Sequence, residues 1–80
     1  MQAEQLQALI ENAVPDSQAQ VQIEGNHVHV RVVSPAFAGI SPVKKQQMVY
    51  AVLNDRIASG EIHAVHMQTL TPEESASSNG

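Results

Sequence analysis

Hydrophobic and polar residues change their spacing along the chain, and each spacing predicts a different element. In residues 3–14 the apolar positions recur at helical intervals, and they form one stripe of Leu6, Leu9, Ile10 and Ala13. This pattern predicts an amphipathic helix. We expect it to end at Pro15 and Asp16, because a proline disfavours helical geometry in the residue before it.

Residues 18–34 alternate between apolar and polar positions, which is typical of strands with one buried face. Gly25 and Asn26 divide the run and suit a two-residue β-turn. A turn of that length fixes the register of the predicted hairpin. On the buried side, the expected facing pairs are Ile23 with Val28 and Val21 with Val30. On the solvent-exposed side, they are Glu24 with His27, Gln22 with His29 and Gln20 with Arg31.

The main helix is predicted at residues 42–58. Ser41 is a good N-cap, and Pro42 occupies the first helical position, where its missing N–H has no cost. Gly60 suits the helix end, because glycine readily adopts the left-handed conformation. The expected apolar face consists of Val43, Tyr50, Leu53 and Ile57. Before this helix, Pro35 ends the hairpin, and a short helical turn at residues 36–38 is expected to anchor Phe37 in the core.

A third strand is predicted at residues 62–69, and a capping box at residues 71–74 starts a short terminal helix. The expected order is α-β-β-α-α-β, an α+β fold in which helices pack on one face of a three-stranded mixed sheet. Residues 1–74 are expected to form a single small domain. Residues 75–80 are expected to be a polar, disordered tail.

Composition excludes several functions. The chain has 80 residues, no cysteine and a formal net charge of −4, so it supplies no thiolate, and a general affinity for nucleic acid is disfavoured. It contains no long apolar run and no signal peptide, which predicts a soluble cytoplasmic protein without membrane contact. Metalloprotease, phosphate-loop and nucleophile-elbow motifs are all missing, so we expect no enzyme.

Four histidines are the side chains with candidate chemistry. His27 and His29 share the wet face of the hairpin, where with Glu24 they are either solvated or ligands of a borderline metal such as zinc or copper. His66, in the middle of a strand, is expected to be a packed or rim residue. His63 starts the third strand after a glycine turn, where its side chain can stay open to a partner.

Two lysines, Lys44 and Lys45, lie in the first turn of the predicted main helix, where the helix dipole disfavours cations. They are either screened surface residues or part of a site for anions or nucleic acid, to which Arg31 is a further candidate contributor.

Several motifs together resemble the BolA-like family, and the match covers nearly the whole chain. They are Phe37-Ala38-Gly39, the run from Ser41 to Tyr50, Ile62-His63-Ala64-Val65 and Thr71-Pro72-Glu73, together with the hairpin. The Lys-Lys-Gln-Gln run is similar to that of the acid-stress, IbaG-type branch.

The resemblance implies a fold similar to class II KH domains and a role as a non-enzymatic partner of monothiol glutaredoxins. The two proteins would share a bridging 2Fe–2S cluster in iron–sulfur trafficking or in iron and stress sensing. His63 matches the family's cluster-ligating histidine, and His27 is the nearest candidate for a second ligand from the hairpin. The isolated chain would bind no cluster, and would be a monomer or a weak homodimer.

The alternative function is a transcriptional regulator that binds nucleic acid through the first turn of the main helix. The acidic balance predicts weak affinity for DNA that disappears at physiological salt. Gly39-Ile40-Ser41-Pro42 lacks the second glycine of the GxxG clamp, so RNA binding in the manner of KH domains is unsupported.

Overall fold

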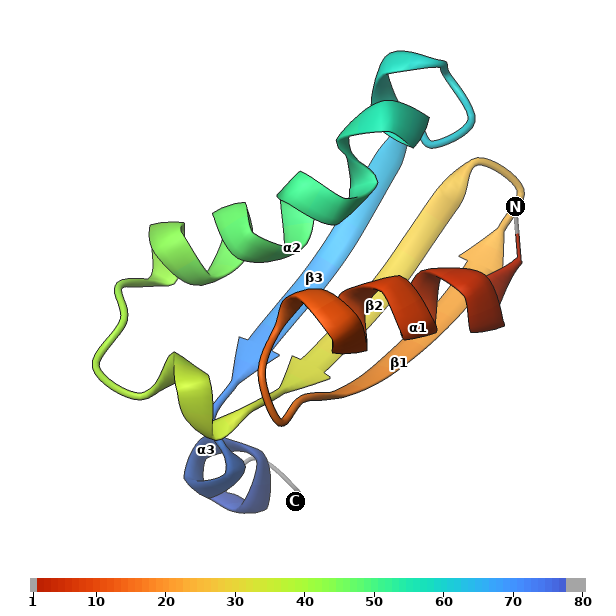
Figure 1. The fold of residues 1–80 in the computed structure, drawn as a ribbon. Helices are drawn as coiled ribbons and strands as arrows, with labels where there is room; N and C mark the ends of the chain where they lie inside the picture. The colour runs from red at the N-terminus through yellow and green to blue at the C-terminus, as the bar shows by residue number, and fades with distance from the viewer. Residues whose placement is uncertain (1, 78–80) are drawn as a thin grey trace.

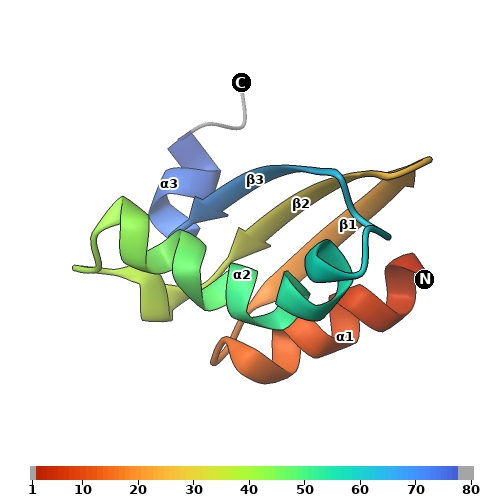
Figure 2. The same ribbon diagram turned by 90° about the horizontal axis from the view of Figure 1, so that it is seen from above.

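The computed structural model describes residues 2–77, and within them the predicted α+β fold is confirmed. The elements follow one another in the order α1 (Ala3–Ala13), β1 (Gln18–Glu24), β2 (His27–Val33), the 3-10 helix η1 (Pro35–Phe37), α2 (Pro42–Ala58), β3 (Ala64–Leu70) and α3 (Pro72–Ser77). Helices α1 and α2 cover one face of the sheet, and α3 lies at the end where β3 finishes (Figure 1, Figure 2).

The three strands are ordered β1-β2-β3, with β1 and β2 antiparallel and β2 and β3 parallel. The sheet is therefore mixed, as predicted. The hairpin register is also confirmed, because Glu24 pairs with His27 and Ile23 pairs with Val28. Gly25 has a φ of 60°, so the turn uses the conformational freedom of glycine at its first central position.

The core lies between the helices and the covered face of the sheet, and it is aliphatic apart from one ring. Phe37 of η1 is fully buried. The other buried apolar residues are Leu6, Ile10, Val14, Ala19, Val28, Val30, Val32, Val49, Leu53 and Ile62. The hydrophobic alternation of β2 therefore directs Val28, Val30 and Val32 to the core and leaves the polar residues of β2 on the opposite face.

The predicted apolar faces of the two long helices are partly wrong. In α1, Leu6 and Ile10 are buried, but Leu9 is 40% exposed and Ala13 is exposed. Val14 is buried instead. Leu6, Ile10 and Val14 are spaced four residues apart, so they form a narrow stripe that contacts the core. Leu9 and Ala13 lie beyond the border of that stripe.

In α2, Leu53 is buried and Tyr50 is partly buried, whereas Val43 and Ile57 are exposed. Residues on two successive turns form the compact patch that meets the core, namely Met48, Val49, Val52 and Leu53. Val43 and Ile57 lie further out toward the two ends of the helix. None of the helices within residues 2–77 has the length and apolar character that crossing a membrane requires.

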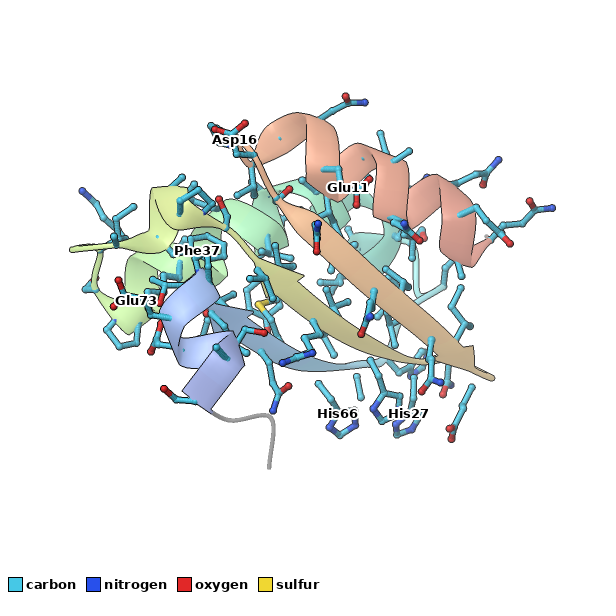
Figure 3. The ribbon with its side chains drawn as sticks, turned by 90° about the horizontal axis from the view of Figure 1, so that it is seen from below. Glu11, Asp16, His27, Phe37, His66 and Glu73 are labelled. Carbon is cyan, nitrogen blue, oxygen red and sulfur yellow. The ribbon has the colours of Figure 1, made fainter. Side chains whose placement is uncertain are left out.

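Side-chain hydrogen bonds fix the first and the last described helices in this framework. Glu11 of α1 accepts a hydrogen bond from the Ala19 N–H at 3.0 Å, which holds the start of the edge strand β1 (Figure 3). The predicted capping box is present, since Thr71 Oγ1 accepts from Glu74 N and Glu74 Oε1 accepts from Thr71 N. The terminal helix α3 continues to Ser77, beyond the domain boundary expected at residue 74, and residues 78–80 of the expected tail lie outside the described residues.

Candidate functional site

The tip of the β1–β2 hairpin lies beside the segment that leads into β3. The Asn26 carbonyl oxygen accepts hydrogen bonds from the His63 N–H at 2.8 Å and from the Ala64 N–H at 3.4 Å. One residue further along, His27 is the register partner of Ala64. The backbone therefore brings His27 and His63, two histidines far apart in sequence, to the same end of the sheet.

His63 owes its position to the loop between α2 and β3. Gly60 ends α2 with a φ of 87°, and the Ile62 N–H donates to the Arg56 carbonyl oxygen at 3.2 Å. The Ile62 side chain is only 2% exposed, so it anchors the loop in the core. His63 follows as an exposed residue just before β3. The strand was predicted to start at Ile62, but it starts at Ala64. Ile62 instead belongs to the loop, where its side chain packs into the core.

Three histidines gather on the face of the sheet that α1 and α2 leave uncovered. His27 and His29 project from β2, and His66 projects from β3, where it is the register partner of His29. The His29 and His66 rings stack with centroids 4.6 Å apart and planes inclined by 13°. The His27 and His66 rings are 5.9 Å apart and inclined by 14° (Figure 3).

Sequence reasoning did not find this cluster. It grouped His27 with His29, but it expected His66 to be a packed or rim residue and did not connect it with them. His66 is exposed, and its neighbours are the other two imidazoles. The open face beside His29 and His66 is hollowed by about 520 Å³, and the polar side chains around the hollow are Gln20, Gln22, His29, Arg31, His66 and Gln68.

Two of the three cations predicted as an anion site have partners in α3. Lys45 Nζ lies 3.4 Å from Glu74 Oε1, and the Lys45 side chain is only 11% exposed. Arg31 donates a hydrogen bond from its guanidinium to Ser75 Oγ at 3.1 Å. Lys44 is exposed in the first turn of α2. The three cations are thus divided between the open face of the sheet and the start of α2.

Among the described residues, Glu74 is the one whose pKa the structure clearly shifts. Its pKa lies below the ordinary value of 4.5, first because the Thr71 backbone N–H donates to its carboxylate and then because Lys45 does so. Both interactions favour the charged carboxylate. Glu74 therefore links the capping box of α3 to the first turn of α2.

Fold and site together define a class: a small α+β domain that presents exposed imidazoles beside a hairpin tip and contains no cysteine. A family model described as BolA-like protein matches residues 4–74. The chain belongs to the BolA-like family.

Individual relatives agree with this assignment. The chain is 40% identical over 74 residues to the acid stress protein IbaG of Escherichia coli strain K12, which covers 92% of this chain and 88% of that protein. This similarity confirms the resemblance to the acid-stress branch.

Solved structures give the same result. A BolA homologue from Coxiella burnetii matches with a TM-score of 0.77 and 26% identity, over 95% of this chain and 97% of that one. The BolA domain of SufE1 from Arabidopsis thaliana matches with a TM-score of 0.75 and 27% identity, over 90% of this chain and 93% of that one.

Proposed function

We propose that this protein is a non-enzymatic partner of a monothiol glutaredoxin and that His63 and His27 contribute ligands to a shared 2Fe–2S cluster. The observation that carries the proposal is the backbone contact between His63 and Asn26 at 2.8 Å. It holds two exposed histidines at one end of the sheet, where a partner can reach both of them. The similarity to the BolA domain of SufE1 supports an iron–sulfur-related role.

The donor set of the chain fits this chemistry. Imidazole nitrogen is an established ligand of 2Fe–2S iron in Rieske centres, where two histidines replace two thiolates on one iron. Since the chain contains no cysteine, every thiolate must come from the partner. A cluster with imidazole ligands has a higher reduction potential than one with thiolates alone.

The residues of the chain would perform two tasks. His63 and His27 would donate neutral ring nitrogens, because a protonated imidazole cannot coordinate a metal. The buried Ile62 and the hydrogen bonds to Asn26 would fix the position of His63 before the partner arrives. A ligand held in place loses less conformational entropy on binding, so this anchoring favours the complex.

Direct regulation of transcription is less well supported by the structure. Lys45 is paired with Glu74, and Arg31 is hydrogen-bonded to Ser75, so two of the three cations would have to leave α3 before they could bind phosphates. With a net charge of −4, few phosphates can be neutralised, and the affinity for duplex DNA should be weak at physiological salt.

The cluster proposal is tested by mixing the tag-free protein with a monothiol glutaredoxin that carries a 2Fe–2S cluster. We expect the visible absorption and circular dichroism spectra to change as a heterodimer replaces the glutaredoxin homodimer. His63→Ala should fold normally, because an exposed side chain contributes little to the core, but the spectral change should disappear. His27→Ala should retain the cluster less well than wild type.

His66→Ala is the matched control, because His66 is also an exposed histidine but lies further along β3. It should give the wild-type spectrum. A wild-type spectrum with His63→Ala, measured under conditions in which the complex still forms, would contradict the assignment of His63.

A further inference from the structure

The three histidines on the open face are brought together by the register of two strands. His27 and His29 are two residues apart on β2, so their side chains emerge on the same face. The parallel pairing of β2 with β3 then places His66 directly opposite His29. Two of these residues, His29 and His66, have no part in the cluster site proposed above.

The separation of the rings suits a metal ion. In a tetrahedral site with zinc–nitrogen bonds of about 2.0–2.1 Å, the centres of two ligand imidazoles lie about 5 Å apart. The observed separations of 4.6 Å for His29–His66 and 5.9 Å for His27–His66 lie on either side of that value. His66 therefore already lies near this spacing from each of the other two rings.

The rings must turn before they can converge. Within residues 2–77 no group of three histidine or acidic side chains is placed so that it could hold a metal ion without movement, and the imidazoles lie nearly parallel to one another. The terminal ring torsion of histidine has a broad, soft energy profile, so rotation can direct the nitrogens inward at low cost. The hollow beside His29 and His66 leaves room for this movement.

The surrounding charges are compatible with a bound cation. Glu24 of β1 is the register partner of His27, which places a carboxylate at the same end of the sheet. The nearest cation along β2 is Arg31, and its guanidinium is hydrogen-bonded to Ser75 of α3, away from the hairpin tip. Arg31 also borders the hollow beside His29 and His66, but its guanidinium is held by Ser75, whereas Glu24 offers a carboxylate beside His27.

We propose that His27, His29 and His66 form a site for a divalent borderline metal ion, with zinc as the representative ion. Three histidines with an open fourth position are an established zinc ligand set. Imidazole also suits copper and nickel, and the Irving–Williams order predicts tighter binding of Cu²⁺ than of Zn²⁺. The site goes beyond the proposed function, because it needs no glutaredoxin and uses His29 and His66, which have no part in the proposed cluster site.

The experiment is a calorimetric titration of Zn²⁺ into the tag-free protein without glutaredoxin, accompanied by the visible spectrum of the Co²⁺ form. We expect one ion per chain and the intense absorption of tetrahedral Co²⁺. Because loss of a group that merely orients a ligand costs about 10–100-fold in affinity, loss of the ligand His66 or His29 to alanine should cost at least about tenfold. His66→Gln gives the same expectation while keeping a polar side chain on the strand.

Gln68→Ala and His63→Ala are the matched controls. Gln68 lies on the same strand and the same face as His66, and His63 is an exposed histidine that precedes the strand. Both variants should bind zinc with affinity within about twofold of wild type, since neither supplies a ligand. Equal zinc affinity in wild type and His66→Gln would overturn the proposal, and so would loss of binding in His63→Ala.

The same variants separate this proposal from the cluster proposal. His66→Gln should lose zinc affinity and keep the spectrum of the glutaredoxin complex, whereas His63→Ala should do the reverse. His27→Ala should weaken both, because His27 belongs to both sets. If one proposal fails, these variants therefore still test the other.

Discussion

Ser34 lies where four segments of the chain meet, and we expect its replacement by alanine to destabilise the fold strongly. Its side chain is fully buried. The hydroxyl donates to the Pro15 carbonyl oxygen at 2.5 Å and accepts from the Ala36 N–H at 3.0 Å. The Ser34 backbone N–H also donates to the Leu70 carbonyl oxygen at 2.9 Å. The residue thus connects the end of α1, β2, η1 and the end of β3.

The expected loss of stability follows from the two hydroxyl bonds. Each contributes about 1 kcal/mol net, and the partly buried partners left without a hydrogen bond add about 1 kcal/mol more. We therefore expect Ser34→Ala to lower the free energy of unfolding by about 2–3 kcal/mol. For a domain of this size, that corresponds to a fall of about 10–20 °C in Tm.

The measurement is equilibrium unfolding in urea followed by circular dichroism, in which the midpoint should fall and the slope should stay unchanged. Ser17→Ala is the matched control. The Ser17 hydroxyl oxygen is also buried, but it has no hydrogen-bond partner within the described residues. Its removal should leave stability unchanged or raise it, because an unsatisfied buried polar group is lost. If the two variants were equally stable, the argument from hydrogen bonding would be refuted.

Two further predictions concern the turn and α3. Gly25→Ala should lower the free energy of unfolding by about 1–2 kcal/mol, because Gly25 has a φ of 60° that alanine adopts with strain; urea unfolding measures this. The Glu74 carboxylate has a pKa lowered by the Thr71 N–H and Lys45, so its stabilising effect is present above pH 4.5 and is lost as pH falls through the lowered pKa. Glu74→Gln should therefore be less stable than wild type at pH 7, and the two unfolding midpoints should converge well below pH 4.5.

The parts of the fold that sequence predicted well are those determined by neighbouring residues. The hairpin register follows from the length of the Gly25-Asn26 turn, because no other pairing closes a two-residue loop. The caps of α2 and α3 follow from Ser41 and Thr71, whose side chains bond to backbone groups three residues away. Local chemistry is sufficient in each case.

The faces of the helices were harder to predict, because α2 carries more than one apolar stripe. Helical spacing fits the predicted set of Val43, Tyr50, Leu53 and Ile57. It fits equally well the set that meets the core, namely Met48, Val49, Val52 and Leu53. Propensity and periodicity do not distinguish between them. The choice depends on which side chains meet β3, α1 and the rest of the core, and that is a property of the assembled tertiary structure.

The sequence could not predict the histidine cluster, because it does not show which alternating set of β3 side chains faces the core. Both alternating sets of β3 contain apolar residues, so the sequence alone cannot assign Val65 or His66 to the core. The structure resolves this through Ile62, which is buried before the strand begins, and through pairing with β2, which directs Val65 and Met67 inward. Since side chains alternate along a strand, this choice also sends His66 to the open face. One long-range register thus determines both the neighbours of His66 and the position of His63 beside the hairpin tip.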